Sequence, residues 1–336
     1  MSRYFVTGGS GFLGRELIRA LCEAGHAVVV LARSPKSEAA VRALGAEPVK
    51  GDLDDVGAMT AGMRGCGVVI HAAAHTEEWD TDEAFWRVNV VGTKNVIEAA
   101  RAAGVRRLVL ISSEAVLADG RPLIRVDETH PYPQKPVRGY PASKGEVERA
   151  VLAANGDGLE TVVVRPRFIW GRGDTANLVK FARAVRDGRF AWVDHGRHLT
   201  SSCHVANVCE GTLLAAERGR PKEIYFLTDG EPVEFRWLLT EILKTQGIPL
   251  PSRSVPRRLA WIAAGVAEAL WRTFRLSGVP FATRVPLALM GVEVTVNDAK
   301  ARRELGYAGR MTIAEGLAEM ARLPKVVPEG VAGRAA

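Results

Sequence analysis

A glycine-rich turn near the start of the chain constrains its fold more than any other feature. Gly8, Gly11 and Gly14 lie between an apolar segment at residues 3–7 and an amphipathic segment at residues 12–24. A glycine triplet with this spacing, placed between a strand and a helix, is typical of dinucleotide-binding turns. The first glycine permits the tight turn, the second lets the backbone approach a pyrophosphate, and the third lets the helix pack on the strand. The N–H groups that open the helix are then available to phosphate oxygens.

The residues after the second apolar run indicate which dinucleotide would bind. NAD-binding turns place an acidic residue there, about 20 to 24 residues after the first glycine, to accept hydrogen bonds from the ribose. This chain has Ala32 at that point, followed by Arg33 and Lys36. A guanidinium can make a bidentate contact with a 2′-phosphate. The sequence therefore favours NADP(H), while NAD(H) stays possible because Arg33 can instead stack on the adenine.

Apolar and amphipathic segments alternate along the first half of the chain. We expect strands over residues 3–7, 26–32, 47–50, 68–71, 107–112 and 160–165, helices over residues 12–24, 36–44, 55–64, 83–103 and 141–155, and a loop over residues 119–139. Continuous apolar runs suit parallel strands that are covered on both faces. The pattern predicts an α/β fold with a Rossmann-type doubly wound parallel sheet.

The alternation loosens after residue 170, which indicates two unequal parts. Residues 1–170 are expected to form the NADP-binding Rossmann domain. Residues 171–323 are expected to form a smaller, mixed α/β substrate-binding part that is interleaved with the first. Residues 324–336, rich in Val, Gly, Pro and Ala, are expected to be a flexible tail.

Composition and charge exclude several classes of protein. Hydrophobic residues make up 47% of the 336 residues and charged residues 25%, which is ordinary for a globular chain. The net charge of +7 is spread thinly, so we expect no nucleic-acid partner. The four cysteines include no Cys-x-x-Cys pair, which predicts reduced thiols and no metal site. No apolar run reaches the roughly 18 residues of a membrane span, and no signal peptide is recognisable, so a cytoplasmic location is expected.

One expected helix, over residues 256–274, is apolar on all sides and has basic flanks. Arg257 and Arg258 stand at its start, and Arg272 and Arg275 at its end. Two interpretations stay open. The helix covers the substrate pocket, or residues 256–275 make a peripheral contact with a membrane surface.

A tyrosine and a lysine four residues apart indicate acid–base chemistry. Tyr140 and Lys144 share one face of the expected helix. A neighbouring ammonium, together with the positive ring of an oxidised nicotinamide, would lower the pKa of the tyrosine. Ser112 and Ser113 end an expected strand, and ligands bind at the carboxyl ends of such strands. These features together predict proton exchange with a substrate hydroxyl or carbonyl group.

With these features the chain resembles the extended short-chain dehydrogenase/reductase family, over about residues 3–322. The resemblance is carried by Thr7–Gly14, Gly51–Leu53, His71–Ala74, Asn89–Thr93, Ser112–Val116, Tyr140–Lys144 and Arg165–Pro166. It implies that Ser113 binds the reacting oxygen and that Tyr140 is the acid and base. It also implies that Lys144 binds the nicotinamide ribose and lowers the pKa of Tyr140. Leu117 departs from the family, where many members carry tyrosine, and this leaves the catalytic residues intact.

The resemblance also implies a cofactor-binding set and an assembly. The set consists of Gly8, Gly9, Ser10, Gly11, Phe12, Leu13, Gly14, Asp52, Leu53, Ala72, Ala73, Ala74, Pro166, Tyr140 and Lys144. By the same resemblance a homodimer is expected, formed through the helices near residues 84–103 and 141–155. Asn89 and His204 are expected to be structural.

Within the family, the chain looks like the branch that contains 3β-hydroxysteroid dehydrogenases, sterol-4-carboxylate dehydrogenases and 2-alkyl-3-ketoacid reductases. That branch shares the stretches Arg165–Gly171, His204–Val208 and Ile224–Pro232. Phe168 stands where sugar-nucleotide epimerases carry asparagine. Ala115 stands where sugar dehydratases carry the second of two acids.

The resemblance therefore implies an NADP-dependent oxidoreductase that interconverts an alcohol and a ketone on a small apolar substrate. Glu114, Phe168 and Trp170 are expected to contact that substrate. One alternative is an NDP-sugar epimerase or dehydratase with the same catalytic residues. Another is a non-catalytic, dinucleotide-sensing regulator, although such proteins typically lose the tyrosine or the lysine, and this chain keeps both.

Overall fold

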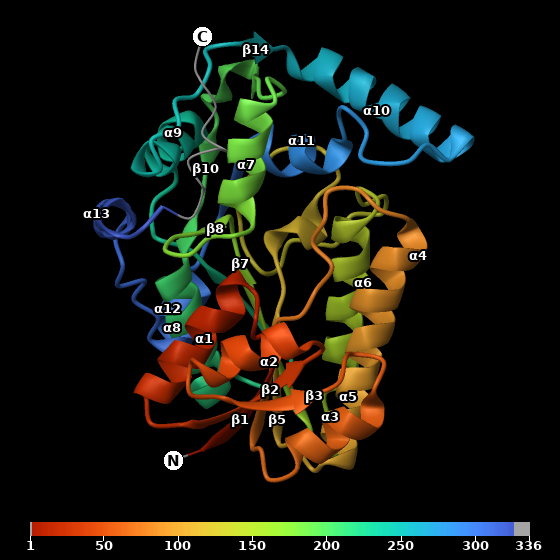
Figure 1. Cartoon of the computed structure of the whole chain (residues 1–336), viewed down its shortest axis with the longest axis vertical. Helices are drawn as coiled ribbons and strands as arrows, with labels where there is room; N and C mark the ends of the chain where they lie inside the picture. The colour runs from red at the N-terminus through yellow and green to blue at the C-terminus, as the bar shows by residue number, and fades with distance from the viewer. Residues whose placement is uncertain (1, 326–336) are drawn as a thin grey trace.

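The computed structural model describes residues 2–325, and its frame is a seven-stranded parallel sheet (Figure 1). The strand order is β12-β7-β5-β4-β1-β2-β3, and every pairing in it is parallel. The strands are β1 (Arg3–Thr7), β2 (Ala27–Ala32), β3 (Glu47–Lys50), β4 (Val68–His71), β5 (Arg107–Ile111), β7 (Glu160–Pro166) and β12 (Glu223–Leu227). This confirms the α/β fold and the doubly wound sheet.

Helices cover both faces of the sheet. Successive residues of each strand point to opposite faces, so each strand contributes side chains to two separate cores. In β1, Tyr4 and Val6 face a core with α1, α8 and α12, whereas Phe5 faces a core with α3, α5 and α6. Figure 1 shows these two helical layers on either side of the strands. The helices are α1 (Phe12–Glu23), α2 (Pro35–Arg42), α3 (Val56–Met63), α5 (Gly92–Ala102), α6 (Tyr140–Ala153), α8 (Val205–Arg218) and α12 (Ala299–Leu305).

The helix expected over residues 83–103 is present, but it is not a regular α-helix throughout. It begins as α4 (Asp82–Phe85), widens into the π-helix η1 (Trp86–Val91) and continues as α5. Single π turns inside helices are often found at functional sites. Here η1 carries Asn89, whose side-chain amide donates to the His75 carbonyl oxygen at 3.1 Å and to Ser143 Oγ at 2.9 Å. This agrees with the expected structural role of Asn89.

The second half of the chain returns to the main sheet before it builds a smaller unit. β12 pairs with β7, and α8 packs under the same sheet, so the two parts share one core. Three small sheets follow the orders β13-β10-β15-β6, β11-β8 and β14-β9. Their strands are β6 (Leu123–Val126), β8 (Ile169–Trp170), β9 (Trp192–Val193), β10 (Leu199–Thr200), β11 (Cys203–His204), β13 (Val233–Glu234), β14 (Ser254–Val255) and β15 (Val294–Val296).

The expectation of a structureless loop over residues 119–139 is wrong in one respect. Residues 123–126 form β6, which pairs in parallel with β15, about 170 residues later in the chain. The pairing brings Leu123 into a small core with Val294 and Val296. No local sequence pattern predicts a strand whose pairing partner lies so far away in the sequence.

Aromatic side chains form the core of the smaller part. Phe168, Trp192 and Phe235 are buried together, with Phe168 edge-on to Phe235 at 5.8 Å between ring centroids. The helices of this part are α7 (Asn177–Arg186), α9 (Phe235–Thr245), α10 (Arg257–Phe274), α11 (Arg284–Met290) and α13 (Ile313–Arg322), and its short 3-10 turn is η3 (Asp194–Gly196). A second 3-10 turn, η2 (Glu114–Leu117), follows β5. All but two residues of the expected tail, 324–336, lie outside the described residues.

Candidate active site

A cavity of about 810 Å³ lies at the carboxyl ends of the main strands. It runs from the glycine-rich turn, past the ends of β2 and β3, to the start of α6 and to α11. The predicted site residues that line it are Gly8, Ser10, Gly11, Phe12, Leu13, Gly14, Arg33, Asp52, Leu53, Ala72, Ala73, Ala74, Ser113, Glu114, Tyr140, Lys144, Pro166 and Phe168. The sheet therefore brings most of the predicted set to one place.

Three predicted residues do not line this cavity. Gly9 faces away from it, where an added Cβ would lie 2.5 Å from the side chain of Val30. Lys36 is exposed in the first turn of α2. Trp170 is buried in the aromatic core, and its indole N–H donates to Asp229 at 2.8 Å. The structure therefore places Gly9, Lys36 and Trp170 outside the cavity wall.

The glycine-rich turn has the geometry of a dinucleotide cradle. Gly8 adopts φ of +74°, and a Cβ there would lie 2.7 Å from the backbone nitrogen of Ala73. A Cβ on Gly14 would collide with the carbonyl oxygen of Gly8, so the helix can pack this closely only with glycine. Gly11 caps α1 without a side-chain hydrogen bond, and the first turn of α1 lines the cavity. A pyrophosphate fits at this helix N-terminus.

The adenosine end of the cavity carries charges of both signs. Arg33 follows β2 and is exposed at the cavity wall, and Asp52 follows β3. The Asp52 carboxylate accepts a hydrogen bond from the backbone N–H of Asp54 at 2.9 Å. Asn95 donates to the Leu53 carbonyl oxygen at 2.8 Å, which fixes this loop against α5. Arg33 thus places a cation on the cavity wall directly after β2.

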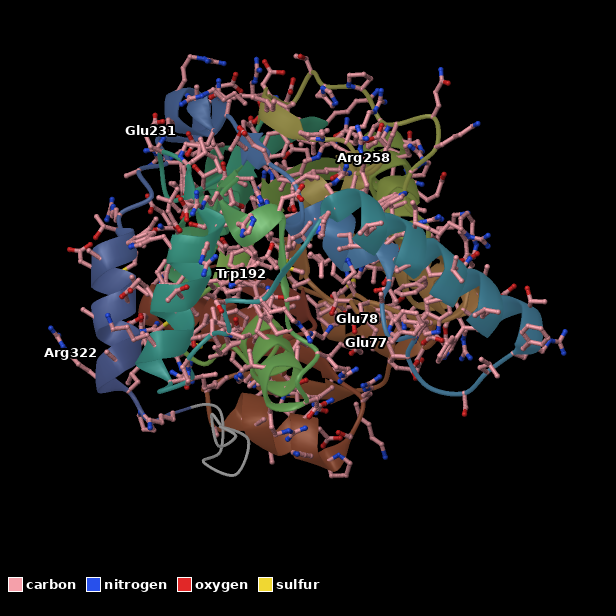
Figure 2. All side chains as sticks on the ribbon, turned by 90° about the horizontal axis from the view of Figure 1, so that it is seen from above. Glu77, Glu78, Trp192, Glu231, Arg258 and Arg322 are labelled. Carbon is pink, nitrogen blue, oxygen red and sulfur yellow. The ribbon has the colours of Figure 1, made fainter. Side chains whose placement is uncertain are left out.

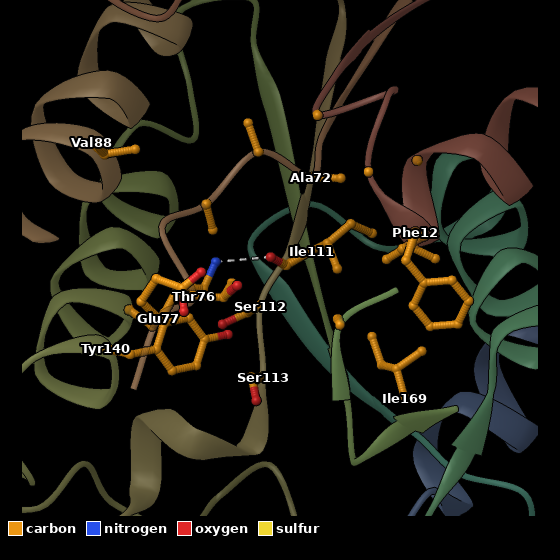
Figure 3. A pocket seen from close by; sticks show the side chains of 18 of the residues that line it. Phe12, Ala72, Thr76, Glu77, Val88, Ile111, Ser112, Ser113, Tyr140 and Ile169 are labelled. Carbon is orange, nitrogen blue, oxygen red and sulfur yellow. Dashed lines mark hydrogen bonds between the residues drawn. The ribbon is translucent and has the colours of Figure 1, made fainter. Parts of the chain in front are cut away.

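Tyr140 and Lys144 lie in the first two turns of α6. Gly139 precedes the helix with φ of +77°, and Pro141 occupies the first turn, where its missing N–H costs nothing. The Lys144 ammonium is buried and donates to the Ile111 carbonyl oxygen at 2.9 Å, the dashed line in Figure 3. Burial lowers the pKa of Lys144 to about 8, against the opposing effect of the Glu148 charge.

Ser113 connects the tyrosine to a neighbouring carboxylate. Its hydroxyl donates to Glu114 Oε2 at 2.7 Å and accepts from the backbone N–H of Ala115 at 3.2 Å. Burial first, and the charge of Glu114 second, raise the pKa of Tyr140 above its ordinary value, while its hydrogen bond with Ser113 opposes this rise. The shift is opposite to the lowering predicted for the cofactor-bound protein, because burial outweighs the nearby hydrogen bond.

A buried ion pair forms the floor of this end of the cavity. Arg167 Nη1 lies 3.2 Å from Glu114 Oε1, and both side chains are 3% exposed. The Arg167 guanidinium also donates to the Leu289 carbonyl oxygen at 2.6 Å, which ties α11 to the site. Arg167 Nε and Ser112 Oγ are buried without a hydrogen-bond partner, and both residues line the cavity. Sequence reasoning missed Arg167, although it stands directly between the predicted residues Pro166 and Phe168.

One stretch of the cavity wall, at Phe168, Ile169 and α11, is apolar. Phe168 has φ of +44°, an uncommon conformation for a bulky residue and one that tends to occur at functional sites. The other apolar residues of this wall are Ile169, Val285, Pro286, Leu289 and Met290. Figure 3 shows Tyr140, Ser112 and Ser113 at one end of the pocket and Phe12 and Ile169 at the other. Such an arrangement, apolar with a few convergent polar groups, is typical of small-molecule sites.

His204 is structural, as expected. It precedes α8, and its ring nitrogen accepts from the backbone N–H of Ala206 at 3.3 Å. Burial lowers the pKa of His204 to about 4, so the ring is neutral near pH 7. Within residues 2–325, no group of His, Cys, Asp and Glu side chains could hold a metal ion.

Comparison with known proteins gives a consistent result. The model of the 3-beta hydroxysteroid dehydrogenase/isomerase family matches residues 5–257. A 4-hydroxy-2-methyl-3-oxo-4-farnesyl-3,4-dihydroquinoline-1-oxide ketoreductase of Stigmatella aurantiaca is 55% identical over 94% of each chain. A 2-alkyl-3-oxoalkanoate reductase of Stenotrophomonas maltophilia is 34% identical over 94% of this chain and 97% of the relative. A decarboxylating sterol-4-alpha-carboxylate 3-dehydrogenase of Dictyostelium discoideum is 32% identical over 95% of this chain and the whole relative.

Solved structures agree in fold. The crystal structure of gox2253 superposes with a TM-score of 0.76 at 30% identity, over 95% of this chain and 98% of that one. A dTDP-glucose 4,6-dehydratase of Streptomyces venezuelae with bound NAD reaches a TM-score of 0.75 at 24% identity, over 95% of this chain and 96% of that one. The second likeness concerns the fold alone.

Proposed function

This chain belongs to the 3-beta hydroxysteroid dehydrogenase/isomerase family, and we propose that it is an NADP(H)-dependent reductase of a ketone on an apolar substrate. It is an oxidoreductase of the extended short-chain type, with Rossmann-type cofactor geometry. One observation carries the proposal above all. The dinucleotide cradle and the Ser113–Tyr140–Lys144 group line the same cavity, which also has an apolar stretch of wall at Phe168 and α11.

The side chains divide the chemistry between them. The glycine-rich cradle would hold a nicotinamide dinucleotide, which would supply the hydride for ketone reduction or accept it in the reverse direction. The ketone oxygen accepts hydrogen bonds from Tyr140 and Ser113, and Tyr140 transfers its proton to that oxygen as the alcohol forms. Lys144, one turn along α6, holds positive charge close to the phenolate that this step leaves. Its buried ammonium also has donors to offer to the ribose hydroxyls.

Arg33 supports NADP(H) as the preferred cofactor. It lines the cavity directly after β2, where NAD-binding relatives of this fold carry an acidic residue. A guanidinium matches a 2′-phosphate in charge and in geometry. Asp52 lies at the end of the neighbouring strand, and its carboxylate already accepts one hydrogen bond from the backbone N–H of Asp54.

The apolar wall supports a substrate with a hydrocarbon portion rather than a nucleotide sugar. Phe168 lines the cavity at the position where the resembled sugar-nucleotide epimerases carry a polar amide. The relative that is 55% identical is a ketoreductase of a farnesylated quinoline N-oxide. We therefore propose that the substrate is a ketone on a ring that bears a prenyl or alkyl chain. The substrate in the relative's name belongs to this class.

The experiment compares three ketones and two sugar nucleotides under one set of conditions. Oxidation of NADPH is followed with the farnesylated quinoline ketone, a 2-alkyl-3-oxoalkanoate and a 3-oxosteroid. Conversion of UDP-glucose and dTDP-glucose is followed by chromatography, because an epimerase or a dehydratase regenerates its cofactor and oxidises no net NADPH. We expect turnover of one or more of the ketones and no conversion of the sugar nucleotides. Conversion of a sugar nucleotide alone would overturn the proposal in favour of the epimerase/dehydratase alternative, and cofactor binding without conversion of any of the five compounds would favour the regulator.

We further infer that two copies associate through α5 and α6. Support comes from the family resemblance and from Trp86 and Val91, which are exposed at 47% and 38% on the π-helical turn that leads into α5. Light scattering on the purified protein tests this inference. A monomer at micromolar concentration would contradict it.

A further inference from the structure

The exposed apolar side chains of this protein are concentrated on α10 and the segment after it. Residues 259–281 hold eight of the fifteen large apolar side chains that are exposed within residues 2–325. These eight are Leu259, Ile262, Val266, Leu270, Phe274, Leu276, Val279 and Phe281. Isolated exposed apolar residues are normal, but a contiguous set usually marks an interaction surface.

The α10 members of this set form a stripe. Leu259, Ile262, Val266 and Leu270 follow one another at intervals of three or four residues, so they share one face of the helix. Ala264 and Ala267 lie on the opposite face and are fully buried against the protein. A surface helix normally turns its apolar face inward and a polar face outward. Here both faces are apolar, so the outer face is suited to contact an apolar surface outside the protein.

The charge around this stripe is strongly positive. Residues 253–284 contain six arginines and one acidic residue, Glu268. Glu268 is itself occupied, because it accepts from the backbone N–H of Arg284 at 2.7 Å. Arg258 and Arg275 are exposed at the two ends of the helix. An apolar stripe with cationic ends matches an anionic bilayer surface, where lipid phosphates meet the acyl chains.

The stripe lies next to the proposed substrate cavity. α10 packs on α11, and the α11 residues Val285, Pro286 and Leu289 line the cavity wall. Trp261 packs inward, within 5.4 Å of the Arg284 guanidinium at the start of α11. Figure 2, seen from above, shows α10 lying across the top of the molecule and projecting beyond its edge. A surface docked on the stripe would therefore lie directly outside α11.

We propose that α10 and residues 276–281 dock this protein on the surface of an anionic phospholipid bilayer. The apolar stripe enters the boundary between headgroups and acyl chains, and Arg258 and Arg275 contact lipid phosphates. The contact is peripheral, since no helix in the described part of the chain is long and apolar enough to cross a membrane. The inference does not depend on which ketone the enzyme reduces.

Vesicle flotation tests the docking directly. The full-length protein is mixed with vesicles of phosphatidylcholine alone, or of phosphatidylcholine and phosphatidylglycerol at about 3:1. We expect binding to the mixed vesicles and a loss of at least about ten-fold in Ile262→Ser/Phe274→Ser, because two exposed apolar groups no longer enter the lipid. Ile124→Ser is the matched control, since Ile124 is 63% exposed on β6, outside the stripe. That variant is expected to bind like the parent.

A charge variant and two further measurements separate the possible outcomes. Arg258→Glu/Arg275→Glu should weaken binding to the mixed vesicles several-fold, and added salt should weaken binding of the parent. Circular dichroism verifies folding, and turnover of a short water-soluble ketone, equal in parent and variants, separates a docking defect from an inactive enzyme. No binding of the parent to mixed vesicles would overturn the proposal. So would a parent dimer that Ile262→Ser/Phe274→Ser converts to monomers, since a second copy would then cover the stripe.

Discussion

Replacement of Lys144 by methionine tests the electrostatics of the site without any substrate. Methionine keeps most of the length of the lysine stem and removes the buried ammonium. In the folded protein, burial lowers the pKa of Lys144 from 10.5 to about 8. Between these two pH values the unfolded chain binds more protons at this residue than the folded protein does. The stability of the parent must therefore rise with pH through this window.

The size of the effect follows from the shift. Each pKa unit corresponds to ~1.4 kcal/mol, so the charged lysine costs the folded protein about 3 kcal/mol at pH 7. Rather less than half of that cost is left at pH 9.5, by the same linkage relation. The parent should therefore gain about 2 kcal/mol between pH 7 and pH 9.5 through Lys144 alone. The Lys144→Met variant lacks this gain.

Urea unfolding of the cofactor-free proteins at both pH values measures the difference. The stability advantage of Lys144→Met over the parent should shrink by about 2 kcal/mol on going from pH 7 to pH 9.5. The variant also leaves the Ile111 carbonyl without its lysine donor, but that loss is the same at both pH values. Lys94→Met, at an exposed lysine on α5, controls for the removal of one positive charge. A difference that is constant with pH would refute the reasoning and place the Lys144 ammonium in contact with water.

Three other substitutions test the remaining roles. Tyr140→Phe removes the proton that goes to the ketone oxygen, so kcat should fall about 10²- to 10⁴-fold while the cofactor Kd changes only a few-fold; unchanged turnover would exclude Tyr140 as the acid. Arg33→Asp should move the ratio of kcat/KM for NADPH over NADH toward NADH, and an unaltered ratio would show that Arg33 does not bind the 2′-phosphate. Arg167→Met leaves the Glu114 carboxylate buried and unpaired, which should cost about 3 to 5 kcal/mol in urea unfolding, with partial recovery in Arg167→Met/Glu114→Gln. Equal stability of the single variant and the parent would mean that water reaches the pair.

The parts of the site that the sequence predicted well are those made by one short segment. The glycine triplet carries its own geometry, because Gly8 needs its positive φ and Gly14 has no room for a Cβ. Tyr140 and Lys144 are related by helical spacing alone. In such segments local chemistry determines the structure, so the pattern is readable without the rest of the fold.

The parts that the sequence did not predict depend on distant segments. Arg167 pairs with Glu114 at the floor of the cavity and donates to the carbonyl oxygen of Leu289, about 120 residues later. Trp170 is two residues from Phe168, yet it lies outside the cavity, because its indole N–H bonds to Asp229 in the smaller part. Neither placement follows from spacing along the chain. Both depend on how the second half folds back over the end of β7.

The hydrogen bonds around Ser113 connect the ion pair to the proposed reaction. A serine hydroxyl has a single proton, and in this structure Ser113 donates it to Glu114. A ketone oxygen that binds beside Tyr140 needs that proton, so the hydroxyl has to turn away from the carboxylate when substrate arrives. Glu114 then still has Arg167 at 3.2 Å, and its buried charge is not left unpaired. We infer that the ion pair allows Ser113 to change acceptor at low cost, and that the buried Arg167 thereby acts as a positioning residue.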